Sequence, residues 1–201
     1  MKSFKSYIKE AVRPKHIAFF DIDETVFNTF AKIVVKDKNT GKEISQLTNQ
    51  EFNSYKLADN EEFDFGQFRS AKIFKDTSKA IGPVLKKVKK VFSNADSMVV
   101  FLTARSDFDS NSTFKDTFRA NGLKVNDPRI RFELTGNLKR GNIPQKKKYV
   151  IKKFLDRFQP ESVSIYDDHD ANVKIADDIK PDYPEIQFDK YLIKNNKIIK
   201  K

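Results

Sequence analysis

Three short apolar runs, each followed by polar residues, constrain the fold of this chain most strongly. The runs cover residues 16–20, 98–102 and 162–166, and segments with helical periodicity lie between them. The polar residues that follow the runs are Asp21, Asp23, Thr103, Arg105, Asp167 and Asp168. Alternation of apolar runs and helices is typical of a parallel α/β sheet, in which the carboxyl ends of the strands share one edge. We therefore expect these polar side chains to converge on one site.

The order of the expected elements predicts an α/β fold with a Rossmann-like, three-layer parallel sheet. Apolar periodicity predicts helices at residues 3–12, 111–120 and 145–158, and a further strand at 130–134. Two short strands are expected on either side of Asn195-Asn196, which is a turn signal.

The segment between the first two apolar runs predicts an insert. Residues 28–80 are too many for a simple crossover between strands, so we interpret them as a small cap or flap. The turn signal Asn39-Thr40-Gly41 predicts a hairpin inside this insert. Residues 1–27 and 81–201 would then form the core.

Composition limits the class of protein. The chain has 201 residues with 19 phenylalanines, enough to build a folded core, and no cysteine for disulfides or thiol catalysis. It contains no apolar stretch long enough to span a bilayer, and the first ten residues lack the apolar core of a signal peptide. We therefore expect a cytoplasmic protein. The net charge of +11 favours polyanions, although a lysine-rich solvated surface explains it equally well.

The spacing of Asp21 and Asp23 points to metal and phosphate chemistry. Residues two apart in an extended chain point to the same side, so both carboxylates would face one crevice at the end of the strand. Two carboxylates can lie this close together when they bind a divalent cation, and a phosphate bound to the same cation would complete the site.

Four segments, taken in order, carry a resemblance to a known family. They are Asp21–Thr25, which reads Asp-x-Asp-x-Thr, the strand Val99–Thr103, the lysines Lys146, Lys147 and Lys148, and Ile165–Asp168. In this order the chain resembles the haloacid dehalogenase-like (HAD) phosphohydrolase superfamily, and within it the phage-encoded phosphatases. The resemblance implies a HAD-like core with a cap inserted after the first motif.

The resemblance and the chemistry of phosphoryl transfer together suggest a role for each residue. Asp21 would be the nucleophile that forms an aspartyl-phosphate, and Asp23 the acid that protonates the leaving oxygen. Either Lys147 or Lys148 would stabilise the developing charge, because both share helical faces with apolar residues. Thr103 would act with them through its hydroxyl. The residues expected to bind substrate are Thr25, Thr103, Ala104 and Arg105.

The resemblance also implies a Mg²⁺ site. Its expected ligands are Asp21, Asp23 through its backbone carbonyl, and Asp168, with Asp167 orienting a metal-bound water. The family often reads Gly-Asp-x-x-x-Asp here, so Asp167 stands at the glycine position and Asn172 at the last acidic position. This departure removes one negative charge from the neighbourhood of the metal.

The resulting prediction is a Mg²⁺-dependent phosphatase acting on phosphomonoesters. Its substrate would be a phosphorylated small molecule such as a nucleotide, or a terminal phosphate of a nucleic acid. No Gly-x-x-x-x-Gly-Lys-Ser/Thr loop occurs, which excludes a bifunctional kinase. The alternative is a non-catalytic phage structural or nucleic-acid-binding protein that retains the fold. His169 is expected to face solvent, and Phe63, Phe65 and Phe68 are expected to pack rather than to stack bases.

Overall fold

A six-stranded sheet forms the centre of the molecule. The computed structural model describes residues 13–52 and 54–201, so the helix expected at residues 3–12 lies outside the described residues. The strand order is β11-β10-β9-β1-β7-β8, and every neighbouring pair is parallel except β10 and β11. The strands are β1 (His16–Phe20), β7 (Ser97–Thr103), β8 (Ile130–Leu134), β9 (Ser162–Asp167), β10 (Gln187–Lys194) and β11 (Lys197–Lys200).

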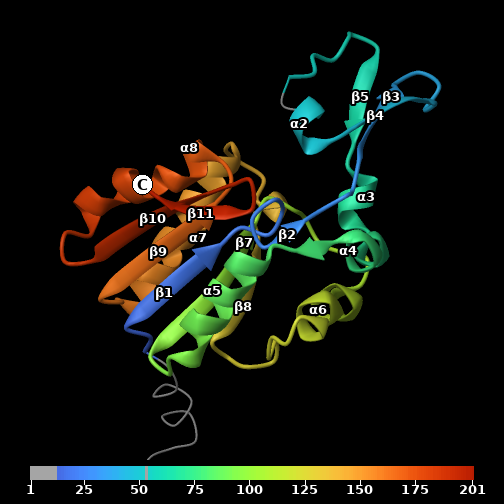
Figure 1. Ribbon diagram of the computed structural model, residues 1–201. Coiled ribbons are helices and arrows are strands. Elements are labelled where there is room, and N and C mark those ends of the chain that lie inside the picture. Colours follow the sequence, from blue (N-terminus) through green and yellow to red (C-terminus); the bar gives the residue numbers. More distant parts are fainter. Residues whose placement is uncertain (1–12, 53) are drawn as a thin grey trace, which may run out of the picture.

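Helices cover both faces of this sheet (Figure 1). They are α5 (Gly82–Ser93), α6 (Asn111–Ala120), α7 (Ile143–Phe158), α8 (Asp170–Val173) and α9 (Ile175–Ile179), with 3₁₀ turns η1 (Thr135–Asn137) and η2 (Lys180–Asp182). The strand residues Ala18 and Phe20 lie in the cluster that includes α5 and α6. Ile17 and Phe19 lie in the cluster that includes α7 and α9. Alternate residues of β1 therefore build the two apolar layers.

The insert leaves the core between two short strands that pair with each other. β2 (Phe27–Asn28) and β6 (Lys79–Ala80) are antiparallel. Between them the described residues form a second sheet, in the order β4-β3-β5, and three short helices. These elements are β3 (Ile33–Asp37), β4 (Glu43–Leu47), α2 (Asn49–Phe52), β5 (Glu61–Asp64), α3 (Gly66–Arg69) and α4 (Ala71–Thr77). A small cluster built on Ile33, Val35 and Leu47 gives this sheet its own apolar contacts.

The structure confirms the predicted α/β class and its mostly parallel sheet. The HAD-like core and the division into core and cap stay predictions. The hairpin turns at Gly41, where φ is +67°, and the pair Asn195-Asn196 also has positive φ values of 50° and 58°. Helix α7 begins two residues before the predicted start, because Asn142 and Gln145 form a capping box.

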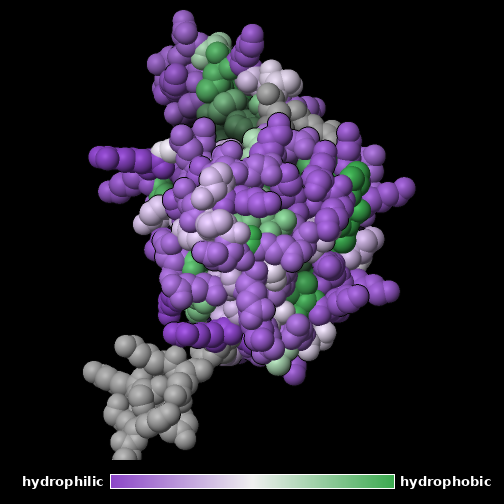
Figure 2. All heavy atoms as spheres, turned by 90° about the vertical axis from the view of Figure 1, so that its left-hand side faces the viewer, coloured by the Kyte–Doolittle hydropathy of each residue, from purple (hydrophilic) through white to green (hydrophobic). Residues whose placement is uncertain are grey.

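The face drawn in Figure 2 is mostly hydrophilic. Purple side chains cover most of it, and green apolar atoms show on the projecting insert and in several places on the core. Phe63, Phe65 and Phe68 contact each other in series, with ring centroids 6.1 and 6.4 Å apart. Among the described residues, none of the helices combines the length and hydrophobicity needed to cross a bilayer.

Candidate active site

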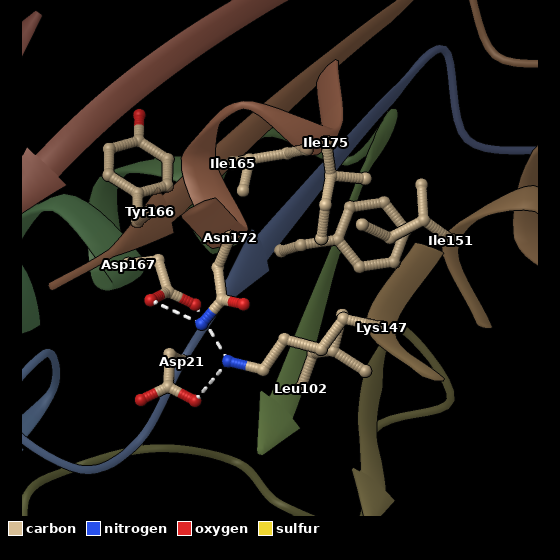
Figure 3. Close-up of a pocket in the computed structure, with 10 residues that line it drawn as sticks. Asp21, Leu102, Lys147, Ile151, Ile165, Tyr166, Asp167, Asn172 and Ile175 are labelled. Atoms are coloured by element: carbon tan, nitrogen blue, oxygen red, sulfur yellow. Dashed lines mark hydrogen bonds and ion pairs between the residues drawn. The ribbon is translucent and has the colours of Figure 1, made fainter. Parts of the chain in front are cut away.

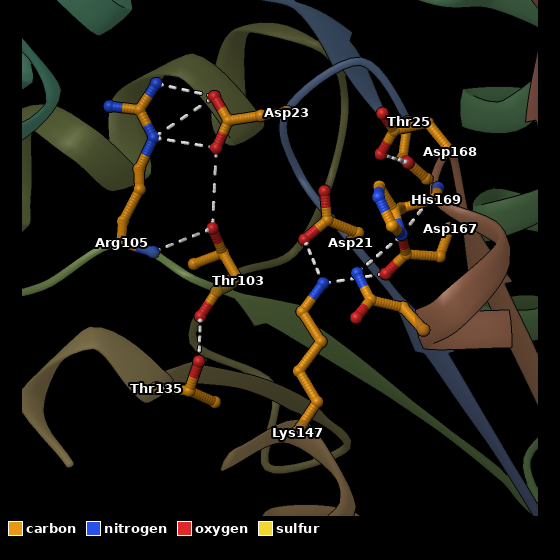
Figure 4. Close-up of polar contacts among 11 residues, drawn as sticks. Asp21, Asp23, Thr25, Thr103, Arg105, Thr135, Lys147, Asp167, Asp168 and His169 are labelled. Atoms are coloured by element: carbon orange, nitrogen blue, oxygen red, sulfur yellow. Dashed lines mark hydrogen bonds and ion pairs between the residues drawn. The ribbon is translucent and has the colours of Figure 1, made fainter. Parts of the chain in front are cut away.

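The site lies at the carboxyl ends of β1, β7 and β9. Asp21 follows β1 and its N–H donates to the carbonyl oxygen of Tyr166, which fixes the first residue after the strand to β9. Thr103 ends β7, and Asp167 ends β9. The side chains of these three residues lie together in Figure 4. Parallel pairing of the three strands explains why residues so far apart in the sequence meet.

Lys147 joins two of the predicted carboxylates. Its Nζ lies 2.6 Å from Asp21 Oδ1 and 2.7 Å from Asp167 Oδ2, and its side chain is only 3% exposed. Val150 and Ile151, on the same face of α7, are buried against the sheet and turn Lys147 inward. Burial favours the neutral amine, but the nearby Asp167 and Asp21 outweigh it and raise the pKa of Lys147.

The neighbouring Lys148 points elsewhere. Its Nζ lies 3.7 Å from Asp178 Oδ2, and both side chains are partly exposed. The sequence left Lys147 and Lys148 as alternatives, and the structure brings only Lys147 into the group of carboxylates.

Asp167 is held from several sides. Its Oδ1 accepts hydrogen bonds from the N–H of His169 and from Asn172 Nδ2, both at 2.9 Å, while Oδ2 meets Lys147. Asn172, which stands where the family often carries an acid, therefore donates to a carboxylate here. The imidazole of His169 is exposed, and its Nδ1 accepts from the Ala171 N–H at the start of α8.

Asp168 lies next to these groups at the solvent-exposed side. The Thr25 hydroxyl donates to Asp168 Oδ1 over 3.4 Å, and in the described part of the chain no cation pairs with this carboxylate. Although the residue is exposed overall, the loss of water around its carboxyl and the charge of Asp167 raise the pKa of Asp168 to about 7. Thr25 is fully buried and is committed to Asp168.

Asp21 has three neighbouring aspartates and only one neighbouring lysine, Lys147. Burial raises the pKa of Asp21, Lys147 opposes this, and the charges of Asp167, Asp168 and Asp23 raise it further. The net direction is upward, because removal from water and three neighbouring carboxylates act together against one cation. Asp168 is thus close enough to Asp21 to act on its ionisation.

Asp23 belongs to a second group of contacts, with Arg105. The guanidinium donates from Nε and Nη2 to the Asp23 carboxylate, the shortest distance being 2.6 Å, and from Nη1 to the carbonyl oxygen of Phe68 at 2.7 Å. Burial raises the pKa of Asp23, but the charge and hydrogen bonds of Arg105 outweigh it and hold this pKa below its usual value. The Arg105 guanidinium, which was expected to bind substrate, therefore already donates its hydrogen bonds to Asp23 and to Phe68.

Thr103 connects this second group to the sheet. Its hydroxyl lies 3.4 Å from Asp23 Oδ2 and accepts from the Arg105 N–H, and its carbonyl oxygen accepts from the Thr135 hydroxyl at 2.9 Å. Ala104, the residue between Thr103 and Arg105, is exposed.

Two residues that support this region were not predicted from the sequence. Thr135 and Gly136 support the loop after β7, and the Gly136 N–H donates to the Arg105 carbonyl oxygen at 3.0 Å. A Cβ at Gly136 would lie only 2.6 Å from backbone atoms of residues 104–106. A glycine after a short strand gives no signal of this close approach, because the partner segment is distant in sequence.

A cavity of about 10 Å³ lies behind Lys147 (Figure 3). Its walls are mostly apolar and include Leu102, Ile151, Ile165 and Ile175. The cavity has room for one water at most, since a water needs about 10–15 Å³. The cavity is therefore too small to hold a phosphorylated molecule.

The fold and the site together define an α/β protein with a carboxylate-rich site at the carboxyl edge of its sheet. Comparisons with protein-family models, with curated proteins and with solved structures found no match for this chain. Within residues 13–52 and 54–201, no three acidic or histidine side chains have the geometry of a metal site. Membership of the HAD superfamily therefore stays a prediction that rests on the motifs.

Proposed function

We propose that this chain is a Mg²⁺-dependent phosphatase of the HAD type that hydrolyses phosphomonoesters through an aspartyl-phosphate on Asp21. The observation that carries the proposal is the meeting of Asp21 and Asp167 on Lys147, which joins three segments distant in sequence. Asp23 and Asp168 lie beside this group, so the predicted nucleophile, acid and metal ligands share one edge of the sheet.

The residues present supply the oxygen donors that a divalent cation needs, although among the described residues no three of them already have the geometry of a metal site. The site holds the carboxylates of Asp21, Asp23, Asp167 and Asp168, whereas its cationic side chains are Lys147 and Arg105. Carboxyl groups therefore outnumber cationic side chains, and carboxylate and carbonyl oxygens are the ligands that Mg²⁺ prefers. Asp21, the Asp23 carbonyl and Asp168 would hold the ion, with Asp167 as support. When bound, the ion would neutralise the excess charge and screen Asp21 from an anionic phosphate.

In the first half of the reaction, a carboxylate oxygen of Asp21 attacks phosphorus and the bond from phosphorus to the leaving oxygen breaks. Asp23 gives its proton to that oxygen. Arg105 favours the ionised form of Asp23, whereas the charge of an incoming phosphate favours the protonated form that this step requires. Lys147 keeps its proton, holds the Asp21 carboxylate in place for the attack and stabilises the negative charge of the transferred group.

In the second half, Asp23 takes a proton from a water molecule that attacks the phosphorus of the aspartyl-phosphate. The bond between phosphorus and Asp21 breaks, which yields inorganic phosphate and restores the Asp21 carboxylate. Thr103 would present its hydroxyl, and Ala104 its backbone N–H, to the phosphate oxygens. Asp167 is too fully hydrogen-bonded to move and serves to keep Lys147 in place.

Release of phosphate from a chromogenic aryl phosphate tests the proposal. We expect turnover that requires Mg²⁺ and is lost in Asp21→Asn, because the amide is not a nucleophile. Asp178→Asn is the matched control, since Asp178 is an exposed carboxylate that pairs with Lys148 outside the site. Turnover of Asp21→Asn equal to that of the wild type would exclude Asp21 as the nucleophile.

A further inference from the structure

Glu24 is a carboxylate beside the site that the proposed reaction does not use. It directly follows Asp23 and has a left-handed φ of 54°. Glycine adopts this conformation without strain, whereas a residue with a Cβ adopts it at a cost in free energy. The side chain of Glu24 therefore has to be explained by the groups around it.

The Glu24 carboxylate is held by the residue that follows β2. The Thr29 N–H donates to Glu24 Oε1 at 3.1 Å, and the Thr29 hydroxyl lies 3.4 Å from the same oxygen. The Glu24 N–H in turn donates to the carbonyl oxygen of Phe27 at 2.8 Å. These bonds stabilise the loop between β1 and β2 and explain why residue 24 carries a hydrogen-bond acceptor. A glutamine would accept the same bonds, so they do not explain the charge.

Glu24 lies close to two carboxylates of the site. The Thr29 side chain also forms a hydrogen bond with Asp23, so a single hydroxyl group lies between the carboxylates of Glu24 and Asp23. Burial raises the pKa of Glu24, and the charge of Asp23 raises it further. On the other side, the charge of Glu24 adds to the burial and to the neighbouring acid that raise the pKa of Asp168. Glu24 is therefore near enough to act electrostatically on both aspartates.

A second pair of the same residue types shows what is particular to Glu24. Glu51 accepts the N–H of Thr48 at 2.7 Å and its hydroxyl at 2.8 Å, but it is an exposed residue of the insert. These hydrogen bonds lower the pKa of Glu51. At Glu24 the same kind of contact is outweighed by burial and by the charge of Asp23. Glu24 thus differs from an ordinary loop acceptor in lying among other acids.

The charge of Glu24 has no cation of its own. Within the part of the chain that the structure describes, its carboxylate contacts Thr29, and no lysine or arginine pairs with it. Lys147, Arg105 and a divalent cation would together carry as many positive charges as the four aspartates of the site can carry negative ones. Glu24 adds a fifth carboxylate. Its charge acts in all directions, so its effect on a neighbouring group depends on distance and not on where the side chain points.

We propose that Glu24 selects substrates by the charge of their leaving group; the proposal rests on the phosphatase function proposed above. The leaving oxygen lies at Asp23 when it takes up the proton, so the atoms next to that oxygen come close to Glu24. A negative charge on these atoms is repelled, and an ammonium group is attracted. The substrates are therefore phosphomonoesters of neutral or amine-bearing alcohols. Phosphate esters of hydroxy acids and the terminal phosphates of nucleoside diphosphates and triphosphates are disfavoured.

Three phosphate esters of similar size test the proposal. They are 2-hydroxyethyl phosphate, phosphoethanolamine and phosphoglycolate, whose leaving groups are neutral, positive and negative. Their kcat/KM values are measured with the full chain and Mg²⁺, and then with Glu24→Gln, which keeps an acceptor for Thr29 but removes the charge. We expect the variant to raise kcat/KM about fivefold for phosphoglycolate and to lower it about fivefold for phosphoethanolamine, with the smallest change for the neutral ester. Coulomb's law for two charges about 8 Å apart gives a smaller factor in water and a larger one near a protein surface.

Opposite changes for two substrates distinguish an effect of charge from a damaged site, which would slow all three reactions. Both changes should become smaller as the salt concentration rises, because salt screens charges at the surface. An equal change for all three esters in Glu24→Gln would overturn the proposal, because the role of Glu24 would then be structural.

Two further variants separate the charge from the hydrogen bonds. Glu51→Gln is the matched control, since it removes a charge with the same contacts to a threonine, and it should change none of the three substrates. Thr29→Val removes the hydroxyl and keeps the charge of Glu24, so it should change all three substrates by the same factor. If Thr29→Val reversed the order of the substrates as Glu24→Gln does, the hydrogen bond would set the selection and the proposal would be wrong.

A binding measurement separates this inference from the proposed function. In the Asp21→Asn background, adding Glu24→Gln should lower the dissociation constant of phosphoglycolate and raise that of phosphoethanolamine. Turnover of the three esters without any effect of Glu24→Gln on kinetics or binding would overturn the selection by charge alone. Absence of turnover with every phosphomonoester, the aryl phosphate included, would overturn the phosphatase and, with it, the selection.

Discussion

Arg105 holds Asp23 with three hydrogen bonds, from Nε to both carboxylate oxygens (3.2 and 2.9 Å) and from Nη2 to Oδ1 (2.6 Å). The remaining terminal nitrogen donates to the Phe68 carbonyl oxygen on the insert, and the guanidinium lies 4.7 Å from the Phe68 ring. The orientation of Asp23 and the position of the insert are thus fixed by the same side chain.

Replacing Arg105 by Ala should therefore lower both stability and activity. Asp23 would lose its cation in a largely buried place, so we expect the free energy of unfolding to fall by roughly 3 kcal/mol. We expect kcat for an aryl phosphate to fall at least tenfold, because Asp23 is no longer oriented. Urea denaturation and steady-state kinetics measure the two effects.

Arg129 provides the matched control for Arg105. Arg129 also forms an ion pair with an aspartate, Asp127, at 3.1 Å. It donates to the carbonyl oxygen of Phe92, and its guanidinium lies 4.4 Å from the Phe92 ring. Arg129 directly precedes β8, so it lies at the end of the sheet opposite to the carboxylates of the site. Arg129→Ala should lower stability and leave kcat unchanged. A normal kcat in Arg105→Ala would show that Arg105 does not position the acid.

Lys147 and Lys148 make a second pair of contrasting variants. Lys147→Met leaves Asp21 and Asp167 without their shared cation, so we expect kcat to fall by at least about 100-fold. Lys148→Met removes only a weak pair with Asp178, and the free energy of unfolding should change by no more than about 0.5 kcal/mol. The reverse ranking of kcat in the two variants would assign the catalytic lysine to position 148.

The sequence could predict the strand ends but not this choice of lysine. Asp21, Thr103 and Asp167 come directly after buried strands, and parallel pairing brings such positions together whatever the connections. Lys147 and Lys148 each share a face with apolar residues of α7, so periodicity does not rank them. The packing of α7 on the sheet decides, and it depends on the Asn142 cap and on residues of β1 and β9.

Contacts with the insert were beyond sequence reasoning for a different reason. β2 and β6 have two residues each, too few for a periodic signal. β5 reads Glu-Glu-Phe-Asp, an acidic sequence whose place in a sheet comes from pairing with β3. Arg105 contacts Phe68 on the insert, and residue spacing alone does not predict where Phe68 lies. The role of Arg105 in joining Asp23 to the insert could therefore not be predicted from the sequence.

Replacing Asp168 by Asn should have opposite effects on thermal stability in the absence and in the presence of Mg²⁺. Without the ion, Asp168→Asn removes a charge that repels Asp167, so we expect the melting temperature to rise by about 2–4 °C. With Mg²⁺ in excess, the wild type should gain stability that the variant lacks, because a ligand of the ion is lost. Thermal melts with EDTA and with Mg²⁺ measure both.

Asp170 supplies the control for this experiment. It is an exposed carboxylate that pairs with Lys201 over 3.3 Å, and Asp170→Asn should respond to Mg²⁺ as the wild type does. A wild-type melting temperature that is the same with EDTA and with Mg²⁺ would contradict the metal site.

Gly136 should tolerate no side chain, because the atoms around it belong to the backbone. An added Cβ would lie 2.6 Å from the Ala104 carbonyl oxygen, from the Arg105 carbonyl carbon and from the Ser106 nitrogen. Relief requires the loop after β7 to move, and that loop carries the Arg105 guanidinium to Asp23. We expect Gly136→Ala to lower the free energy of unfolding by about 1–3 kcal/mol and to lower kcat as Arg105→Ala does.

Gly82, at the start of α5, separates the close approach at Gly136 from the general cost of replacing a glycine. A Cβ there would meet nothing within 4 Å, so the free energy of unfolding of Gly82→Ala should differ from that of the wild type by no more than about 0.5 kcal/mol. Chemical denaturation and kinetics of both variants test the point. Wild-type stability in Gly136→Ala would mean that residues 104–106 yield easily, and the loop would then be a poor support for Arg105 and for the backbone that we propose to face the phosphate.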